Sequence, residues 1–208
     1  MAAAAPPKVF IATPAYGCLV ANAYLSSLLA ARVELSRRGI ASAVHMTGNE
    51  SLVQRARNLM TAAFLRSDCT HMVWIDADIA FNAETLLRML EFDKDITTAI
   101  YAKKNINWDR VYAATTSAEP LEQRGLDFNI NVVGASPLEG GSDVTDYIAL
   151  YDCMIDPESR RYLSEDYAFV RRAQLLGIKV HACIRSCLGH VGSFTYKPSM
   201  GRVGAPAT

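Results

Sequence analysis

The segment His71-Met-Val-Trp-Ile-Asp76-Ala-Asp78 carries an apolar run of strand-forming residues directly into two aspartates. The run His71–Ile75 predicts a short strand. Two carboxylates that leave the end of a strand are the oxygen ligands that hard divalent cations prefer. The segment therefore predicts both an element of the fold and a candidate site.

Two more strand-like runs precede this segment, and a helical pattern follows each of them. The expected elements are, in order, a strand at Lys8–Thr13, a helix at Leu19–Arg38, a strand at Ala41–Met46, a helix from Ser51 to Ala63 and the strand at His71–Ile75. This alternation predicts an α/β fold with a mostly parallel central sheet and helices on both faces. Because ligands bind beyond the carboxyl ends of such strands, we expect Thr13–Gly17 and Asp76–Asp78 to line one crevice.

The second half of the chain is less regular. We expect a strand at Asp95–Tyr101, a loop at residues 118–146, a helix at Tyr162–Leu176 and a strand at Lys179–Ile184. No linker or repeat is visible, so residues 1–208 are predicted to form a single domain. Residues 1–7 are expected to be a flexible tail, and residues 118–146 a mobile loop.

Composition excludes several classes of protein. The chain has 208 residues, 50% of them hydrophobic, with 21 Lys and Arg against 21 Asp and Glu, so no basic field favours nucleic acid as a partner. No stretch approaches the roughly 20 apolar residues of a membrane span. The five cysteines are an odd number, which indicates free thiols in a reducing compartment. We expect a cytoplasmic protein with no membrane span.

The paired aspartates Asp76 and Asp78 are the sharpest candidate site. They are predicted to hold Mg²⁺ or Mn²⁺, with a substrate diphosphate completing the shell. The alternative is that Asp78 or Asn82 only caps the helix that starts near Ala83. That alternative gives Asp76 no role.

His190 lies between two glycines near the C-terminus and is a candidate nitrogen ligand. A histidine in an apolar stretch is, however, often a core residue. A rival interpretation is a zinc site formed by His181, Cys183, Cys187 and His190, although this spacing lacks the paired CxxC of structural zinc sites.

Ser164-Glu165-Asp166 begins the late helix. One carboxylate, Asp166 or failing that Glu165, is predicted to enter the crevice as a general base or to stabilise positive charge on a sugar carbon. The alternative is a capped helix start, with Ser164 as N-cap and acidic residues at the positive end of the helix dipole.

Basic and amide side chains provide candidate nucleotide contacts. Arg55, Arg57 and Asn58 are expected to hydrogen-bond a base and ribose, unless they form a solvated helix edge. Lys103 and Lys104 follow the strand at Asp95–Tyr101 and are candidates to neutralise phosphates. A surface pair is the alternative.

Five motifs in order resemble nucleotide-sugar glycosyltransferases of the Rossmann-like GT-A fold, including small transferase domains of bacteria and large algal viruses. The motifs are Ile11-Ala-Thr-Pro14, Gln54-Arg-Ala-Arg-Asn58, Ile75-Asp-Ala-Asp-Ile79, Tyr162-Leu-Ser-Glu-Asp-Tyr-Ala-Phe169 and Gly189-His-Val-Gly192. The resemblance covers roughly residues 8–105 and 150–195. Its specificity lies in the order of the motifs, since a D-x-D alone is common.

This resemblance implies a set of roles. The donor, a UDP-sugar, would be bound by Thr13, Pro14, Ala15, Tyr16, Arg55, Arg57, Asn58, Asp76, Ala77, Lys103 and Lys104. The metal, Mn²⁺ or Mg²⁺, would be bound by Asp76, Asp78 and His190, with Asp166 at the reacting end. The implied acceptor is a glycan or protein-linked glycan, and further domains of a longer chain are possible partners.

Two other functions stay open at this stage. A catalytically silent module that binds a nucleotide sugar or glycan would not need the acidic pair or His190. A sugar nucleotidyltransferase would carry a Gly-rich phosphate loop after the first strand, and Thr13-Pro-Ala-Tyr-Gly17 is poor in glycine. A metal-dependent transferase is therefore the favoured prediction.

Overall fold

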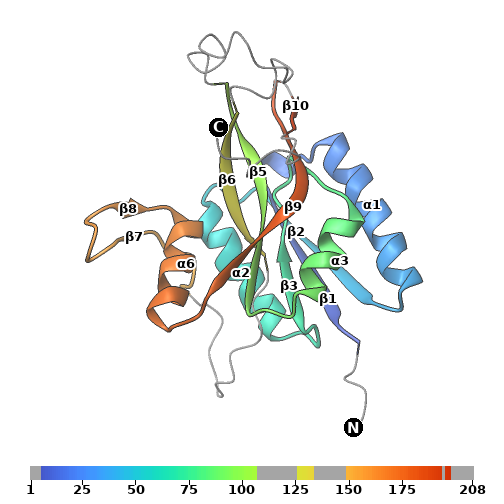
Figure 1. Ribbon diagram of the computed structural model, residues 1–208, viewed down its shortest axis with the longest axis horizontal. Helices are drawn as coiled ribbons and strands as arrows, with labels where there is room; N and C mark the ends of the chain where they lie inside the picture. The colour runs from blue at the N-terminus through green and yellow to red at the C-terminus, as the bar shows by residue number, and fades with distance from the viewer. Residues whose placement is uncertain (1–5, 107–125, 134–148, 194, 198–208) are drawn as a thin grey trace, which may run out of the picture.

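The protein has an α/β fold, as predicted (Figure 1). The computed structural model describes residues 6–106, 126–133, 149–193 and 195–197. The helices are η1 (Tyr16–Cys18, a 3₁₀ turn), α1 (Asn22–Arg37), α2 (Val53–Leu65), α3 (Ala83–Glu91) and α6 (Glu165–Leu175). The strands are β1 (Lys8–Ala15), β2 (Ala41–Gly48), β3 (His71–Trp74), β4 (Ile79–Ala80), β5 (Ile96–Ile106), β6 (Leu126–Val133), β7 (Met154–Ile155), β8 (Tyr162–Leu163), β9 (Val180–Val191) and β10 (Thr195–Tyr196).

A parallel sheet with the order β2-β1-β3 forms the first half. Side chains along β1 alternate between two cores. Val9 and Ile11 pack with the helices α1 and α3, whereas Phe10 and Ala12 pack with α2 and α6. Helices therefore cover both faces, with α1 and α3 on one side of the strands and α2 and α6 on the other (Figure 1).

The second sheet is mixed, with the order β10-β9-β5-β6 and β4 attached to β9. Strand β5 runs parallel to β9 but antiparallel to β6. The expectation of a mostly parallel sheet is thus correct for the first half of the chain and wrong for the second. Residues 126–133 form β6 within the predicted loop, because they pair with β5 along most of its length.

Several predicted boundaries are corrected. Strand β9 continues seven residues past Ile184 and carries His190 into pairing with β4. The helix expected from Tyr162 begins at Glu165, since Tyr162–Leu163 instead pairs with β7. Residues 1–5 of the tail, and 118–125 and 134–146 of the loop, lie outside the described residues.

Helix starts also differ from the prediction. Ser51 does not cap α2, because Leu52 occupies the N-cap position and makes no side-chain capping hydrogen bond. Asn82 caps α3, because its Oδ1 accepts from the N–H of Thr85 at 2.7 Å. Asp78 is therefore not needed as the cap of that helix.

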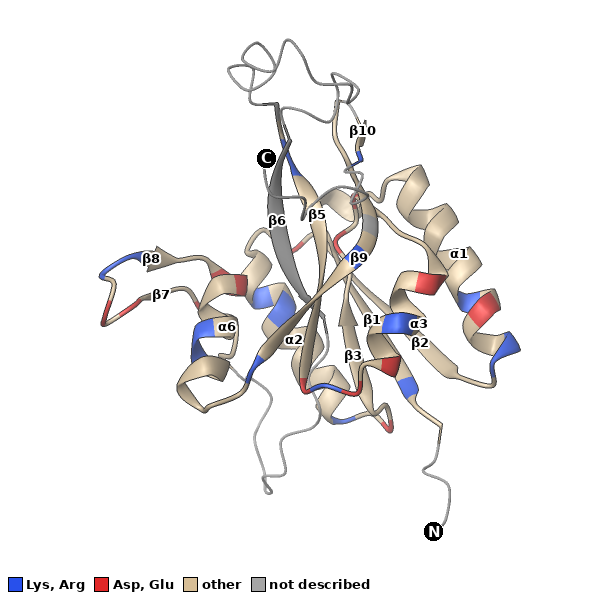
Figure 2. Cartoon of the chain, in the orientation of Figure 1, with Lys and Arg blue, Asp and Glu red and all other residues tan. Residues whose placement is uncertain are grey.

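Charged residues of both signs are spread over the helices and loops (Figure 2). This distribution matches the equal numbers of basic and acidic residues. Within the described ranges, no helix has the length and apolar character to cross a membrane. The single-domain organisation stays a prediction.

Candidate functional site

A cleft of about 610 Å³ lies beyond the carboxyl ends of β1 and β3. Its lining includes Pro14, Ala15, Tyr16, Thr47, Glu50, Ala56, Arg57, Asp76, Ala77, Asp78, Tyr101, Glu165 and His190. The predicted convergence of the two strand-end loops is confirmed for Pro14–Tyr16 and Asp76–Asp78. The volume lies within the range of small-molecule sites.

Backbone hydrogen bonds fix the aspartate loop in this cleft. The N–H of Ala21, at the start of α1, donates to the carbonyl of Ala77 at 2.8 Å. The N–H of Val191 in β9 donates to the carbonyl of Asp78, also at 2.8 Å. The backbone of this loop is thereby held between the first helix and the last long strand.

Arg57 connects the first aspartate to the start of α6. Its Nη2 donates to Oδ1 of Asp76 at 2.9 Å, and its Nε lies 3.5 Å from Oε1 of Glu165. That Nε is buried and finds no hydrogen-bond partner among the described residues. The guanidinium therefore lies between two carboxylates that both face the cleft.

Aromatic rings form the wall behind Arg57. Its guanidinium carbon lies 5.0 Å from the ring centroid of Trp74 and 5.9 Å from that of Tyr151. The two rings meet edge to face, and the indole N–H of Trp74 donates to the hydroxyl of Tyr151 at 2.6 Å. A cation over such faces is held in place electrostatically as well as by packing.

Burial and charge set the protonation of this group. Burial raises the pKa of Glu165, although the nearby charge of Arg57 opposes the shift. Burial would lower the pKa of Arg57, but the negative charges around it, Asp76 first among them, raise it overall. Arg57 thus stays charged, while Glu165 has the raised pKa that suits proton transfer.

Asp78 faces a different set of partners. The ammonium of Lys104 contacts its Oδ2, and Nε2 of His190 lies 3.6 Å from the same oxygen. Burial would raise the pKa of Asp78, but hydrogen bonds from His190 and Lys104 hold it below its usual value. The carboxylate of Asp78 is therefore ionised at neutral pH.

The donor set at Asp78 fits a divalent cation. Nδ1 of His190 lies 2.9 Å from the carbonyl oxygen of Ala102, which can only accept, so Nδ1 carries a proton and Nε2 is the nitrogen that faces Asp78. Metal-binding histidines commonly make this second hydrogen bond. Across the described ranges, however, no three His, Cys, Asp or Glu side chains are gathered as a metal site. Asp76 is turned toward Arg57 instead.

The alternative zinc cluster is wrong. His181 pairs with Thr97 near one end of β9, whereas His190 pairs with Ile79 near the other. At about 3.3 Å per residue, strand positions this far apart are separated by well over 20 Å. Cys183 is buried in the core.

Some residues predicted to bind the donor do not line the cleft. Thr13 is fully buried, and its hydroxyl hydrogen-bonds that of Tyr24 at 2.5 Å. Asn58 is also fully buried; its amide donates to Asp152 and accepts from the N–H of Tyr151. Both side chains therefore have structural hydrogen bonds within the core.

Two basic residues that were also predicted to bind the donor lie at the surface. Arg55 pairs with Glu50 rather than pointing into the cleft, and Lys103 is exposed on β5. Their predicted contacts with a nucleotide stay predictions.

Of the two acidic residues at the start of α6, Glu165 enters the cleft. Asp166 does not line it: its Oδ1 accepts from the hydroxyl of Ser164 and the N–H of Tyr167. Ser164 occupies the N-cap position, yet its side chain accepts no capping hydrogen bond. The geometry therefore favours the reserve candidate, Glu165, over Asp166.

Trp74 and Tyr151 are parts of the site that the sequence alone does not indicate. Trp74 belongs to an apolar strand, and no local pattern marks Tyr151, which is 77 residues away along the chain. The available signal was Arg57, which lies three residues before Met60 on an otherwise apolar helix face. A buried arginine on such a face needs partners, and here these include the aromatic rings of Trp74 and Tyr151.

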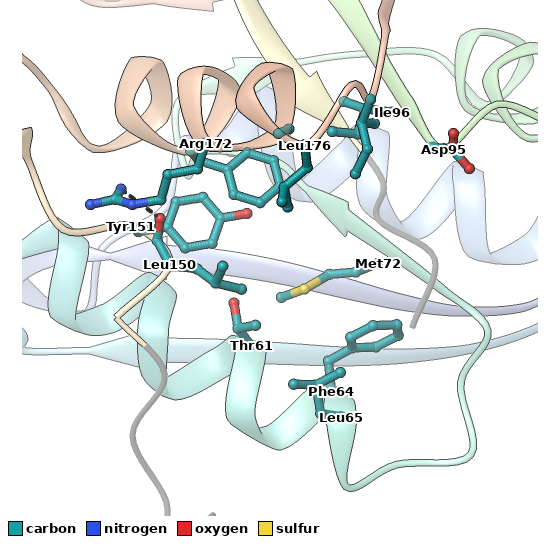
Figure 3. A pocket seen from close by; sticks show the side chains of 13 residues that line it. Thr61, Phe64, Leu65, Met72, Asp95, Ile96, Leu150, Tyr151, Arg172 and Leu176 are labelled. Carbon is teal, nitrogen blue, oxygen red and sulfur yellow. Dashed lines mark hydrogen bonds between the residues drawn. The ribbon is translucent and has the colours of Figure 1, made fainter. Parts of the chain in front are cut away.

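A second pocket of about 350 Å³ lies on the α2 and α6 side of the sheet (Figure 3). Phe64, Met72, Leu150 and Tyr151 line it, and none of the predicted site residues does. The guanidinium of Arg172 is turned outward to the carbonyl oxygens of Leu150 and Asp152. Tyr151 lines this apolar pocket, and the guanidinium carbon of Arg57 lies 5.9 Å from the centroid of its ring.

Comparison with models of known protein families gave no match, and comparison with curated proteins gave none. The function must therefore be argued from the cleft itself.

Proposed function

We propose that the protein is a metal-dependent glycosyltransferase of the GT-A type that uses a nucleoside diphosphate sugar as donor. One observation carries this proposal. A single cleft at the ends of parallel strands contains an ionised aspartate beside a histidine, and, across from them, a half-buried glutamate with a raised pKa. Such a combination serves a reaction that needs charge neutralisation at one end and proton transfer at the other.

Asp78 and His190 would hold the divalent cation, with Asp76 as the third ligand implied by the family resemblance. When bound, the cation supplies Lewis acidity that neutralises the departing diphosphate. The chain's own contribution is the orientation of the ligands. Ala102 fixes the ring of His190, and the N–H of Val191 fixes the backbone of Asp78.

Glu165 is proposed as the general base. It would accept the proton of the acceptor hydroxyl as oxygen attacks the sugar carbon and the bond from that carbon to the diphosphate breaks. Arg57 lies between Asp76 and Glu165 and so orients the carboxylate of Glu165 within the cleft. This assignment replaces Asp166 in the mechanism, because Asp166 is used at the helix start.

The rest of the cleft lining suits a nucleoside. It includes Pro14, Ala15 and the exposed ring of Tyr16, with Thr47 and Ala56. An exposed tyrosine face can stack on a base. Uridine is the base implied by the family resemblance.

Calorimetry with UDP tests the proposal. We expect UDP to bind in Mn²⁺ and to lose most of its affinity in EDTA, with Asp78→Asn removing the metal-dependent increment. The control Asp68→Asn changes an aspartate at the surface and should leave binding intact. ADP and GDP test the identity of the base. Equal UDP affinity with and without Mn²⁺ would exclude a metal-bridged donor, and UDP-sugar turnover then tests the transferase reaction itself.

A further inference from the structure

Each aspartate of the pair already has a basic partner, but the two partners differ in freedom. Arg57, which binds Asp76, has a side chain that is 6% exposed and held against Trp74 and Tyr151. Lys104, which binds Asp78, has a side chain that is 37% exposed. Asp76 is therefore paired with a fixed cation and Asp78 with one that can leave.

Residues of β5 and at the end of β9 allow the side chain of Lys104 to reach Asp78. A Cβ atom placed on Gly192 would lie 3.2 Å from Cδ of Lys104, so the glycine leaves the room through which the lysine stem passes. Ala102, two residues before Lys104 on β5, is the residue whose carbonyl oxygen contacts His190. The same stretch of β5 thus supplies the ammonium and orients the imidazole at one carboxylate.

Lys104 and a divalent cation would compete for the same atom. The ammonium contacts Oδ2 of Asp78, and this is also the oxygen closest to Nε2 of His190. A cation bound between Asp78 and His190 would repel the ammonium, because two positive charges would share one carboxylate oxygen. One of the two must move, and the flexible four-carbon stem of a lysine allows it.

We infer that Lys104 exchanges between Asp78 in the free protein and the diphosphate of the donor in the metal-bound complex. This inference rests on the proposed function. Lys104 stabilises the ionised carboxylate until the cation arrives. It then becomes an additional positive charge for the phosphate oxygens, which lie where the cation binds.

The exchange predicts effects of opposite sign from one substitution. Removing Lys104 removes the competitor, so Mn²⁺ alone should bind more tightly. Removing Lys104 also removes a phosphate contact, so UDP should bind more weakly at saturating Mn²⁺. If Lys104 had only a structural role, its removal would weaken the binding of both Mn²⁺ and UDP. If Lys104 only bound phosphate, its removal would leave the affinity for Mn²⁺ alone unchanged.

The test is a titration of the whole chain with Mn²⁺ in the absence of nucleotide. Electron paramagnetic resonance measures the concentration of free Mn²⁺ at each step. Lys104→Met should tighten Mn²⁺ binding about three- to tenfold, the range expected for loss of a partly exposed ion pair. Lys104→Arg should stay near the wild-type value. Lys103→Met removes the same charge from the adjacent residue and should change Mn²⁺ affinity less than about twofold.

UDP titrations at saturating Mn²⁺ complete the experiment, and Lys104→Met should weaken UDP about threefold or more. Mn²⁺ affinity that is unchanged or weaker in Lys104→Met would overturn the exchange, as would absence of Mn²⁺ binding in both proteins. Equal melting temperatures show that the variants fold. If UDP fails to bind even the wild type, the proposed function fails, while the Mn²⁺ arm still decides whether Lys104 competes with the cation.

Discussion

The guanidinium of Arg57 donates a 2.9 Å hydrogen bond to Asp76 from a position that is almost completely buried. Buried charges need a partner, since an ion taken out of water without one is strongly destabilised. Asp76 reaches the cleft from the other side, with its side chain 32% exposed. The pair therefore connects the protein core to the site, and a change at Arg57 should affect both stability and function.

Arg57→Met should lower the free energy of unfolding by about 3 kcal/mol, the cost of breaking a buried ion pair from one side. The loss of the cation over Trp74 adds to this effect. Arg37→Met makes the same change on the exposed side of α1, where the side chain is 74% exposed, and should cost less than about 1 kcal/mol. Urea unfolding of both variants measures the difference, and equal costs would contradict a buried structural role for Arg57.

The strands β1 and β3 could be predicted because they are buried on both faces. Such strands are continuous apolar runs, and Lys8–Thr13 and His71–Ile75 are easily recognised as such. In parallel sheets, the residues that follow these runs meet at one edge. The placement of Pro14–Tyr16 and Asp76–Asp78 in one cleft thus followed from the sequence.

The choice between Glu165 and Asp166 could not be made in the same way. Adjacent helix residues differ by about 100° around the axis, and the rotation of α6 against the sheet is set by tertiary packing. Glu165 lies three and four residues before the buried Ala168 and Phe169, so it shares their face. This spacing was the available signal for the cleft residue.

The roles of Asn58 and β6 depend on contacts between distant parts of the chain. Asn58 bonds to residues more than 90 positions away, and no local pattern distinguishes that use from a solvated edge. Residues 126–133 pair with β5. Their apolar residues recur at every second position from Leu126 to Val132, which is typical of a strand, so the prediction of a loop overlooked an available signal.

Glu165→Gln should lower turnover by roughly two to four orders of magnitude, the usual contribution of a positioned general base, while UDP affinity in Mn²⁺ changes little. Asp166→Asn should leave turnover near the wild-type level. Asp166→Asn should instead lower the free energy of unfolding by about 0.3 to 1 kcal/mol, because the negative charge at the helix start is lost. Transfer assays and thermal melts on the same preparations distinguish the two. The reverse pattern would restore Asp166 as the base.

The pH dependence of kcat/KM should report Glu165. A general base must be unprotonated, and burial raises the pKa of Glu165, so activity should fall as pH decreases through a value above that of an ordinary glutamate. Because Arg57 opposes this shift, Arg57→Met should move the acid limb to higher pH. An acid limb that persists unchanged in the residual activity of Glu165→Gln would belong to another group.

His190→Ala should weaken the metal-dependent binding of UDP by about 10- to 100-fold, because it removes the nitrogen beside Asp78 and the ring that Ala102 orients. His181→Ala is the matched control. It removes the same side chain from the same strand, at the end that pairs with Thr97 rather than with Ile79, and should leave UDP affinity unchanged. Calorimetry with UDP and Mn²⁺ gives both values. If the two substitutions weaken UDP equally, the effect reflects the stability of β9, and His190 is not a ligand.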